Sequence, residues 1–449
     1  MLLAAASAIP LRIPEVLQLA ASHDFSLPDF FGWIARAPGS APLNHLVQLP
    51  FVVARAPSRL ASRLISVALA IAACYLFLRL VKRIPLDRPY LALLLFMLLP
   101  VHFELSFQAQ PFEQALFLLV IATGCFLRLV FRPGLRRALV YGGCLTLLLY
   151  TDRYSFLPAI GYLLFLLRFI NRAQEGRAIR YVLPATAAPV LLFLPYALWA
   201  HTQVNADWLV GPPALPSRFL FLRVVGSVAA ETWAAYLLSG LLAIGVMAWM
   251  ATSFRITSGG IGKRIRLFSL AGGVIGTVVL AAVLDLHLGV PFTSSQLLWS
   301  APAMVLLVIA GFEWLTKRPE LRPLAHGAAI LLISVCAVAD CQSLFSLSTG
   351  SHREDLQALA AAVPRQLDRD SCVVFVSERF SKTLFLMFEP ELQKRECLDF
   401  FHARVVLASH PYVRPDQQGD AESYFRGLNF TETKRFPMGG GQIVIMQAK

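Results

Sequence analysis

The sequence predicts a polytopic α-helical membrane protein with about ten or eleven transmembrane helices and a small C-terminal α/β domain that faces water. Two observations carry this prediction. The chain is 57% hydrophobic and only 15% charged, whereas soluble domains are nearer to a quarter charged. The apolar residues also come in blocks of about 16 to 22, and a helix that spans a bilayer needs about 20 residues that are apolar on every face. These blocks stop near residue 340, so we divide the chain into a transmembrane domain, 1–340, and a C-terminal domain, 341–449.

The first 13 residues, MLLAAASAIPLRI, are apolar but only about half as long as a span. They lack the basic start of a signal peptide. Either the true start lies upstream and a first helix has been cut off, or this segment is a short interfacial piece. We favour the first alternative.

The segment 14–60 is long for a connector and contains several aromatic residues, which favours a functional loop over a disordered one. Within it, 43–54 (LNHLVQLPFVVA) is apolar but too short to cross a bilayer. We expect a helix that lies along the membrane surface.

The apolar blocks that follow are interpreted as spans. We place them at 62–80, 89–103, 112–130, 138–151, 154–170, 181–200, 231–252, 267–286, 297–316 and 323–340.

Lys and Arg are distributed unequally between the two sets of alternate loops. Nineteen lie within 79–88, 128–137, 168–180, 255–266 and 317–322, whereas the opposite loops contain only Arg153, Arg218 and Arg223. Because cytoplasmic loops are enriched in these residues, we expect the first set inside and the segment 14–60 and the tail outside. The net charge of +13 therefore reflects topology, and we expect no nucleic-acid partner.

The tail alternates helical and strand patterns. We predict helices at 353–366 and 420–428, and strands at 372–377, 403–408 and 442–447. An extracytoplasmic tail would allow a disulfide between Cys372 and Cys397, and two unpaired cysteines are an equal alternative. The histidines are scattered singly, so we expect no structural metal, while a loosely held divalent ion at the acids stays open.

Several short segments carry a family resemblance. An acidic residue near the start of the outward loop precedes Ala41-Pro42-Leu43, and the next helix begins with Arg59 or Arg63. Three motifs follow, SFQAQPFEQALFLL at 106–119, LLYTDRYSFLP at 147–158 and SSQLLWSAPAMVLLVIAGFEWL at 294–315. Their order resembles that of the membrane-embedded GT-C glycosyltransferases, the group that includes protein mannosyltransferases, aminoarabinose transferases and related bacterial enzymes.

The resemblance implies a transferase in the bacterial cytoplasmic membrane, in contact with membrane lipids. It would move a sugar from a polyprenyl-phosphate carrier at the outer face to a glycan, lipid or protein acceptor, without a cofactor. The sequence departs from the family at several positions. Pro14-Glu15 stands where an Asp-Glu pair is usual, Gln110 replaces an Arg, Phe112 replaces a Tyr, and the late Arg-Tyr step is replaced around Ser295 to Leu298.

Sugar transfer needs a carboxylate that takes the acceptor proton, and donors that hold the phosphate leaving group. We assign the carboxylate to Glu15 or Asp24. The substrate-binding candidates are Glu104, Gln108, Gln110, Glu113, Asp152, Arg153, Arg218 and Gln296. Two of them have structural alternatives, because Glu113 suits the N-terminus of its helix, and Asp152 with Arg153 can be a surface ion pair.

A second class of function stays open. Because the departures remove a candidate base and two cations, the chain can instead be an inactive GT-C-like scaffold or a subunit of an envelope complex. A transporter fits less well, since transporters place ionisable residues or broken helices near the middle of the membrane, and the charges here lie at the ends of the spans.

Overall fold

In the computed structural model, the described residues are Glu15, Leu19, 41–53, 59–83, 86–152, 155, 157, 158, 161, 173–203, 295–350, 356–368, 371–376, 385, 386, 388–397, 404–409, 415–438 and 441–448. The chain divides into two compact units. One comprises Met1–Ala37, His45–Ile65 and Leu344–Lys449, and the other comprises Pro38–Asn44 and Ser66–Ser343. The second unit is helical, and the first contains the sheet.

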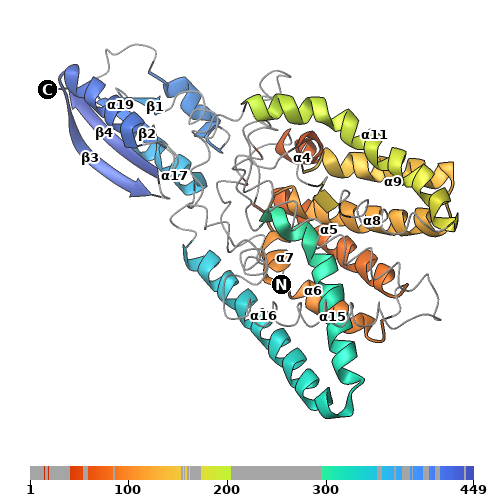
Figure 1. Cartoon of the computed structure of the whole chain (residues 1–449). Coiled ribbons are helices and arrows are strands. Elements are labelled where there is room, and N and C mark those ends of the chain that lie inside the picture. The colour runs from red at the N-terminus through yellow and green to blue at the C-terminus, as the bar shows by residue number, and fades with distance from the viewer. Residues whose placement is uncertain are drawn as a thin grey trace. The chain divides into compact units, whose positions relative to one another are not determined.

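The helical elements follow the predicted apolar blocks (Figure 1). They are α4 (Pro42–Val53), α5 (Arg59–Val81), α6 (Pro89–Met97), α7 (Pro100–Leu105), α8 (Phe112–Phe131), α9 (Leu135–Leu149), α11 (Ala173–Gln203), α15 (Ala301–Thr316, preceded by the 3-10 turn η3, Ser295–Ser300) and α16 (Arg322–Gly350). Among the described residues, five helical stretches are long and apolar enough to cross a membrane: Leu60–Val81, Phe112–Phe131, Ala178–Trp199, Leu298–Thr316 and Pro319–Phe345. The chain is therefore a polytopic helical membrane protein, as the sequence predicts.

Three of the predicted boundaries differ from the structure. The block 89–103 is not one helix, because the residue before Pro100, Leu99, is extended and separates α6 from α7; a residue that precedes proline is pushed out of the helical region. Helix α11 begins at Ala173 rather than 181, and α16 continues to Gly350, beyond the predicted end at 340. The spans 231–252 and 267–286, and most of 154–170, lie outside the described residues.

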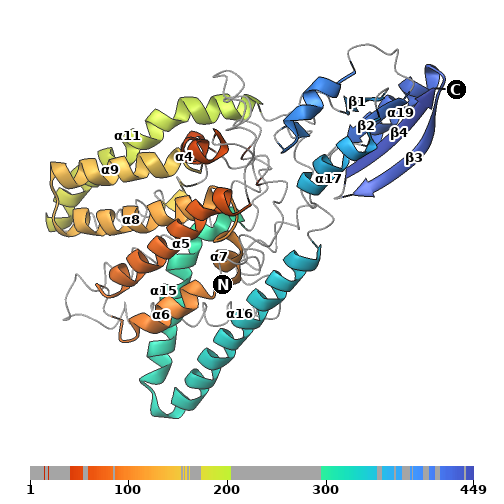
Figure 2. The same cartoon turned by 180° about the vertical axis from the view of Figure 1, so that it is seen from behind.

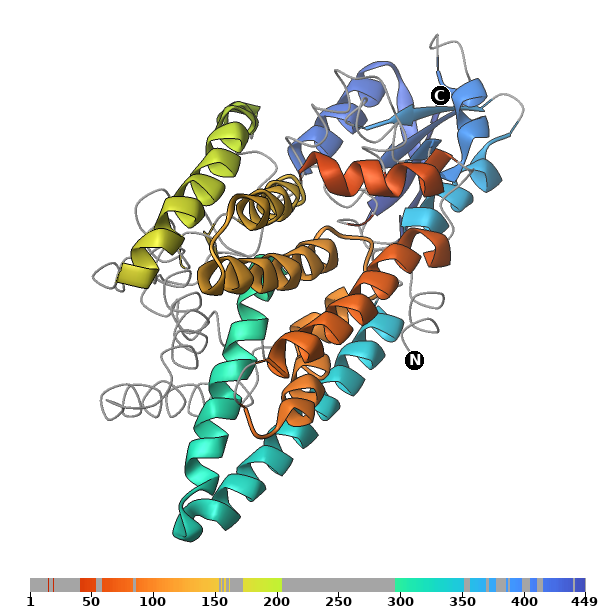
Figure 3. The same cartoon turned by 90° about the vertical axis from the view of Figure 1, so that its right-hand side faces the viewer.

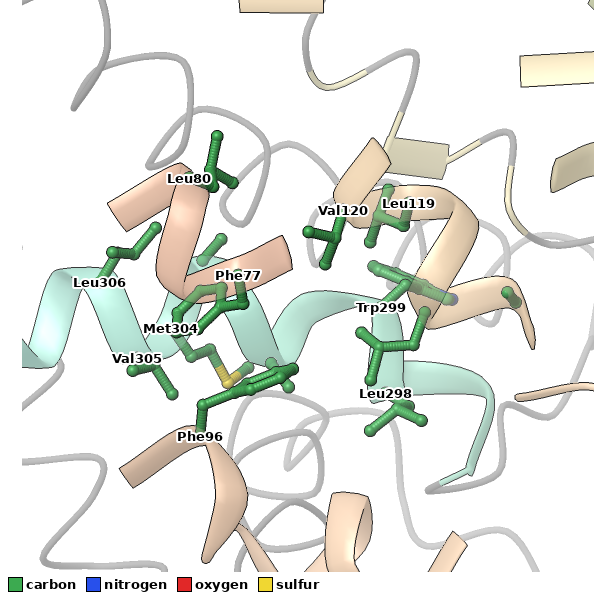
Figure 4. Close-up of a cluster of buried hydrophobic side chains, with 14 of the residues drawn as sticks. Phe77, Leu80, Phe96, Leu119, Val120, Leu298, Trp299, Met304, Val305 and Leu306 are labelled. Carbon is green, nitrogen blue, oxygen red and sulfur yellow. The ribbon is translucent and has the colours of Figure 1, made fainter. Parts of the chain in front are cut away.

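The core of the helical unit gathers around α15, where 83% of the apolar stretch is buried, against 22% for α11. Figure 4 shows Leu298 and Trp299 of η3 beside Leu119 and Val120 of α8, and Met304 near Phe77 and Phe96. On α11, by contrast, neighbouring leucines are two-thirds exposed. An apolar side chain exposed on a helix of this length is stable in lipid, where no hydrophobic penalty applies.

Helices α8, α9 and α11 pack side by side (Figure 3). A methyl group built on Gly142 of α9 would lie 3.2 Å from the backbone oxygen of Ala185 on α11. Small residues at such positions let membrane helices approach closely. Helices α15 and α16 are joined through the short 3-10 turn η4 (Pro319–Leu321) and form a hairpin (Figure 2).

The sheet has four strands in the order β1-β2-β4-β3: β1 (Ser371–Phe375), β2 (Arg404–Ser409), β4 (Gly441–Ala448) and β3 (Phe430–Met438). Strands β1 and β2 are parallel, and the other two pairs are antiparallel. Helix α17 (Leu356–Ala362) contacts β4, and α19 (Pro415–Gly427) contacts β3. The predicted helices and strands of the tail are confirmed, and β3 is an additional strand that the sequence analysis did not include.

Strand β1 is linked to the segment before β2 by a disulfide between Cys372 and Cys397, whose Cα atoms are 5.0 Å apart. Of the two alternatives that the sequence left open for these cysteines, the structure has the bonded one.

Candidate functional site

Glu15 and Arg63 form a buried ion pair in the unit that contains the sheet. The guanidinium donates from Nε to Oε1 at 2.8 Å and from Nη2 to Oε2 at 2.6 Å. Both side chains are at most 1% exposed. Charged side chains are buried to this extent almost only when they are paired, and the two parallel hydrogen bonds are the strong bidentate arrangement. Glu15 and the first turns of α5 are thus joined at one charged contact.

Polar side chains on α4 are also buried, although the sequence predicts a surface helix there. Asn44, His45 and Gln48 are each at most 2% exposed, and they occupy one face of the helix. Ser62 and Ser66 of α5 are buried as well. This face of α4 is therefore inside the protein, whereas a helix that lies along the membrane surface would leave polar side chains exposed to water.

The end of α7 and the turn that leads to α8 contain a chain of side-chain hydrogen bonds. Gln108 donates from Nε2 to Oε1 of Glu104 at 3.2 Å, and Gln110 donates to Oε1 of Gln108 at 3.0 Å. Three of the predicted substrate-binding residues therefore lie together on one short segment of the chain.

Glu113 is paired with a residue that the sequence analysis did not select. Its carboxylate is fully buried at the start of α8, and Oε2 lies 3.5 Å from Nε2 of His102 on α7. Asp340 on α16 is also buried, and its charge acts on His102. An acid inside an apolar span is a functional candidate by default. Asp340, at the end of the predicted span 323–340, could therefore have been selected from the sequence.

Asp152 is buried, and it accepts a hydrogen bond from the hydroxyl of Ser155 at 3.3 Å. A solvated surface ion pair would leave Asp152 exposed, so its burial does not fit that alternative. Asp24, Arg153 and Arg218 lie outside the described residues, and Gln296 is described only as part of the turn η3.

A metal site of three or more His, Cys, Asp or Glu side chains does not occur among the residues that the structure describes. In the unit that contains the sheet, Glu15 and Arg63 hold a carboxylate beside a guanidinium. In the helical unit, Glu104, Gln108 and Gln110 form a row of hydrogen-bonded polar groups. A carboxylate can accept a proton, and N–H groups can hold an anionic oxygen.

Comparison with known proteins gives no match to a family model and no match to a curated protein. Solved structures do match. ArnT from Cupriavidus metallidurans in the apo state superposes with a TM-score of 0.59 at 11% sequence identity, and the alignment covers 99% of this chain and 95% of that one. The Archaeoglobus fulgidus oligosaccharyltransferase in complex with Zn and sulfate gives a TM-score of 0.49 at 15% identity, over 88% of this chain and 55% of that one. The match to ArnT covers nearly the full length of both chains. The chain therefore has the GT-C-like fold that the resemblance of its motifs implied.

Proposed function

We propose that this chain is a glycosyltransferase that moves a sugar from a polyprenyl-phosphate carrier to an acceptor at the outer face of the cytoplasmic membrane. The observation that carries the proposal is the buried pair of Glu15 and Arg63 within a GT-C fold. The pair places a proton acceptor and a cation within hydrogen-bonding distance of each other, and transfer from a phosphate needs both.

The reaction forms a bond between the anomeric carbon of the sugar and the acceptor oxygen or nitrogen, and it breaks the bond between that carbon and the phosphate oxygen. The acceptor proton goes to a carboxylate, Glu15 in the first instance and Asp24 as the other candidate. The electron pair of the broken bond stays on the polyprenyl phosphate. Arg63 donates two hydrogen bonds to Glu15, and in the proposed mechanism the positive charge of its guanidinium favours the phosphate that leaves.

Two observations support the placement of this chemistry at the outer face. By the count of Lys and Arg in the sequence, the positive-inside rule assigns the segment of Glu15, the tail and the loops poor in these residues to the outside. The disulfide of the tail is of the kind that persists in oxidising compartments.

The buried amides of the turn 104–111 extend the proposal. Gln110 donates to Gln108, and Gln108 donates to Glu104; amide groups of this kind bind sugar hydroxyls as both donors and acceptors. We assign sugar binding to this turn. Arg153, Arg218 and Gln296 remain candidates for the carrier phosphate, and a divalent ion bound only with substrate is compatible with the acids.

The test is transfer by the full-length protein in nanodiscs, with a panel of polyprenyl-phosphate monosaccharides labelled in the sugar and membrane lipid extract as acceptor. We expect Glu15→Gln or Asp24→Asn to reduce turnover by about 100-fold or more, the usual contribution of a general base. Glu391→Gln is the matched control, because Glu391 lies in an exposed pair with Lys394. Unchanged rates in both test variants would remove Glu15 and Asp24 from the mechanism.

A catalytically inactive scaffold is the second candidate, and one observation favours it. The carboxylate of Glu15 is fully buried and already bonded to Arg63, an arrangement that also serves structure alone. Binding separates the two candidates, because an enzyme recognises the carrier. Polyprenyl phosphate should raise the melting temperature of the wild type and not that of Arg63→Gln. If the panel gives neither transfer nor a shift, the scaffold is the better description.

A further inference from the structure

Three ionisable side chains are buried in the helical unit and interact electrostatically, and Glu15 belongs to the other unit. His102 comes from α7, Glu113 from the first turn of α8 and Asp340 from α16, and all are at most 3% exposed. Helix α16 is more than 200 residues away in the sequence from the other two. The proposed sugar transfer assigns no proton chemistry to this cluster.

The imidazole of His102 is fixed in orientation. Its Nδ1 lies 2.9 Å from the backbone oxygen of Phe96, and the ring stacks on that of Phe96 with centroids 4.5 Å apart. A carbonyl oxygen only accepts hydrogen bonds, so Nδ1 carries a proton. The other nitrogen, Nε2, therefore faces Glu113, 3.5 Å from Oε2. This contact is attractive when a single proton lies between them, either on the nitrogen or on the carboxyl.

The carboxyl oxygens of Glu113 and Asp340 outnumber the hydrogen-bond donors that the described residues place near them. Within the described part of the chain, both oxygens of Glu113 and both oxygens of Asp340 lack a hydrogen-bond partner, as does Nε2 of His102. An ionised carboxylate without a partner is costly in a protein interior, and more so at membrane depth. One imidazolium balances only one of the two acids, so the cluster carries a net negative charge unless it binds a second proton.

In the part of the chain that the structure describes, the two acids also interact with cysteine side chains. Glu113 acts on Cys74 of α5, and Asp340 acts on Cys336, one turn earlier on α16. The buried amide of Gln114 is the next polar group on α8, and its oxygen has no donor among the described residues. These neighbours contribute no positive charge, so a proton is the simplest neutralising ligand.

We propose that His102, Glu113 and Asp340 form a buried proton-binding site that holds two protons, one shared between His102 and Glu113 and the other on the carboxyl of Asp340. Release of the second proton leaves a net negative charge between α7, α8 and α16. Because α7 and α8 flank the turn 104–111, a change in this charge also changes the electrostatic environment of Glu104 and Gln108. The inference does not depend on sugar transfer.

The test is an infrared titration of the full-length protein in nanodiscs, which detects the C=O stretch of protonated carboxyl groups. We expect the wild type to keep a protonated carboxyl near neutral pH and to lose it as the pH rises. Asp340→Asn should lack this band, and His102→Asn should shift the pH at which it disappears. Asp87→Asn is the matched control, because Asp87 is exposed at the start of α6.

Thermal unfolding in detergent provides a second readout that does not rely on the band. A protonated Asp340 is mimicked by asparagine, so Asp340→Asn should fold and melt no lower than the wild type near neutral pH. The proposal is overturned if the wild type has no protonated carboxyl near neutral pH, if Asp340→Asn retains the band, or if millimolar NaCl or MgCl₂ removes the band at constant pH. The last result would identify a small cation as the ligand instead.

Discussion

Arg63 donates two hydrogen bonds to the carboxylate of Glu15, although 48 residues separate them in the sequence. Both charges are withdrawn from solvent, so each is stable only because of the other. Removal of one partner from a buried pair leaves an uncompensated charge, at a cost of about 3–5 kcal/mol, whereas replacement of both partners by apolar residues is often nearly neutral. The pair is therefore a strong energetic link between the outward loop and α5.

Arg63→Leu should destabilise the protein by about 3–5 kcal/mol, and Glu15→Leu should do the same. The double variant should be more stable than either single variant, which thermal unfolding in detergent measures as a double-mutant cycle. Lys394→Leu is the control, since an exposed pair contributes about 0–1 kcal/mol. Additive effects of the two substitutions would show that the charges do not interact.

Both residues of this pair belong to the features that carry the family resemblance, but nothing in the sequence indicates that they contact each other. Glu15 was selected as an acid in an outward loop, and Arg63 as an Arg at the start of a helix. Hydropathy identifies the segments that are long and apolar enough to cross a bilayer, but it does not indicate which helices contact one another. For the same reason Asp340 was visible as an acid in an apolar block, while its electrostatic interaction with His102 could be found only in the folded structure.

Local chemistry explains the other differences. The break between α6 and α7 follows from Pro100 and was hidden by a continuous apolar pattern. Strand β3 reads FTETKRFPM, with charges and a proline that mark an edge strand rather than a buried one. Periodicity detects a strand when one face is apolar, and β3 is paired on one side only.

Gly142 should be intolerant of a larger side chain. Its missing Cβ would lie 3.2 Å from the oxygen of Ala185, so Gly142→Leu forces α9 away from α11 and should cost about 1–3 kcal/mol. Gly143→Leu is a matched control on the same helix, because nothing lies within 4 Å of its Cβ position. Melting temperatures in detergent compare the two variants. Equal losses would show that the close approach of α9 to α11 does not determine the effect.

The disulfide should stabilise the C-terminal domain. A bridge between Cys372 and Cys397 closes a loop of 25 residues, and its removal should cost about 2–4 kcal/mol. The measurement is the melting temperature of the double serine variant, with Cys341→Ser as control because Cys341 is an exposed free thiol. Mass spectrometry of alkylated protein from cells should find Cys372 and Cys397 unmodified before reduction. Alkylation of both without reductant would contradict the bridge.

The acid sensitivity of the sheet should depend on Glu432. A hydrogen bond from Arg435 holds the pKa of Glu432 below its ordinary value of 4.5, and hydrogen bonds to Glu432 and Glu422 raise the pKa of Arg435. A depressed folded pKa means that the unfolded chain binds the proton more readily. The contribution of this carboxylate is therefore present above about pH 4.5 and is lost as the pH falls through the folded value.

Hydrogen exchange of β3 and β4 amides measures this contribution without unfolding the helical unit. We expect Glu432→Gln to be less protected than the wild type at pH 7, and the ratio of the two rates to approach one below the folded pKa, because both side chains are then neutral. The ratio cancels the intrinsic pH dependence of exchange. Glu391→Gln, which removes an equally charged group from an exposed pair with Lys394, should give a ratio near one throughout. A constant ratio for Glu432→Gln across this range would mean that the amide change, and not the charge on Glu432, determines the protection of the sheet.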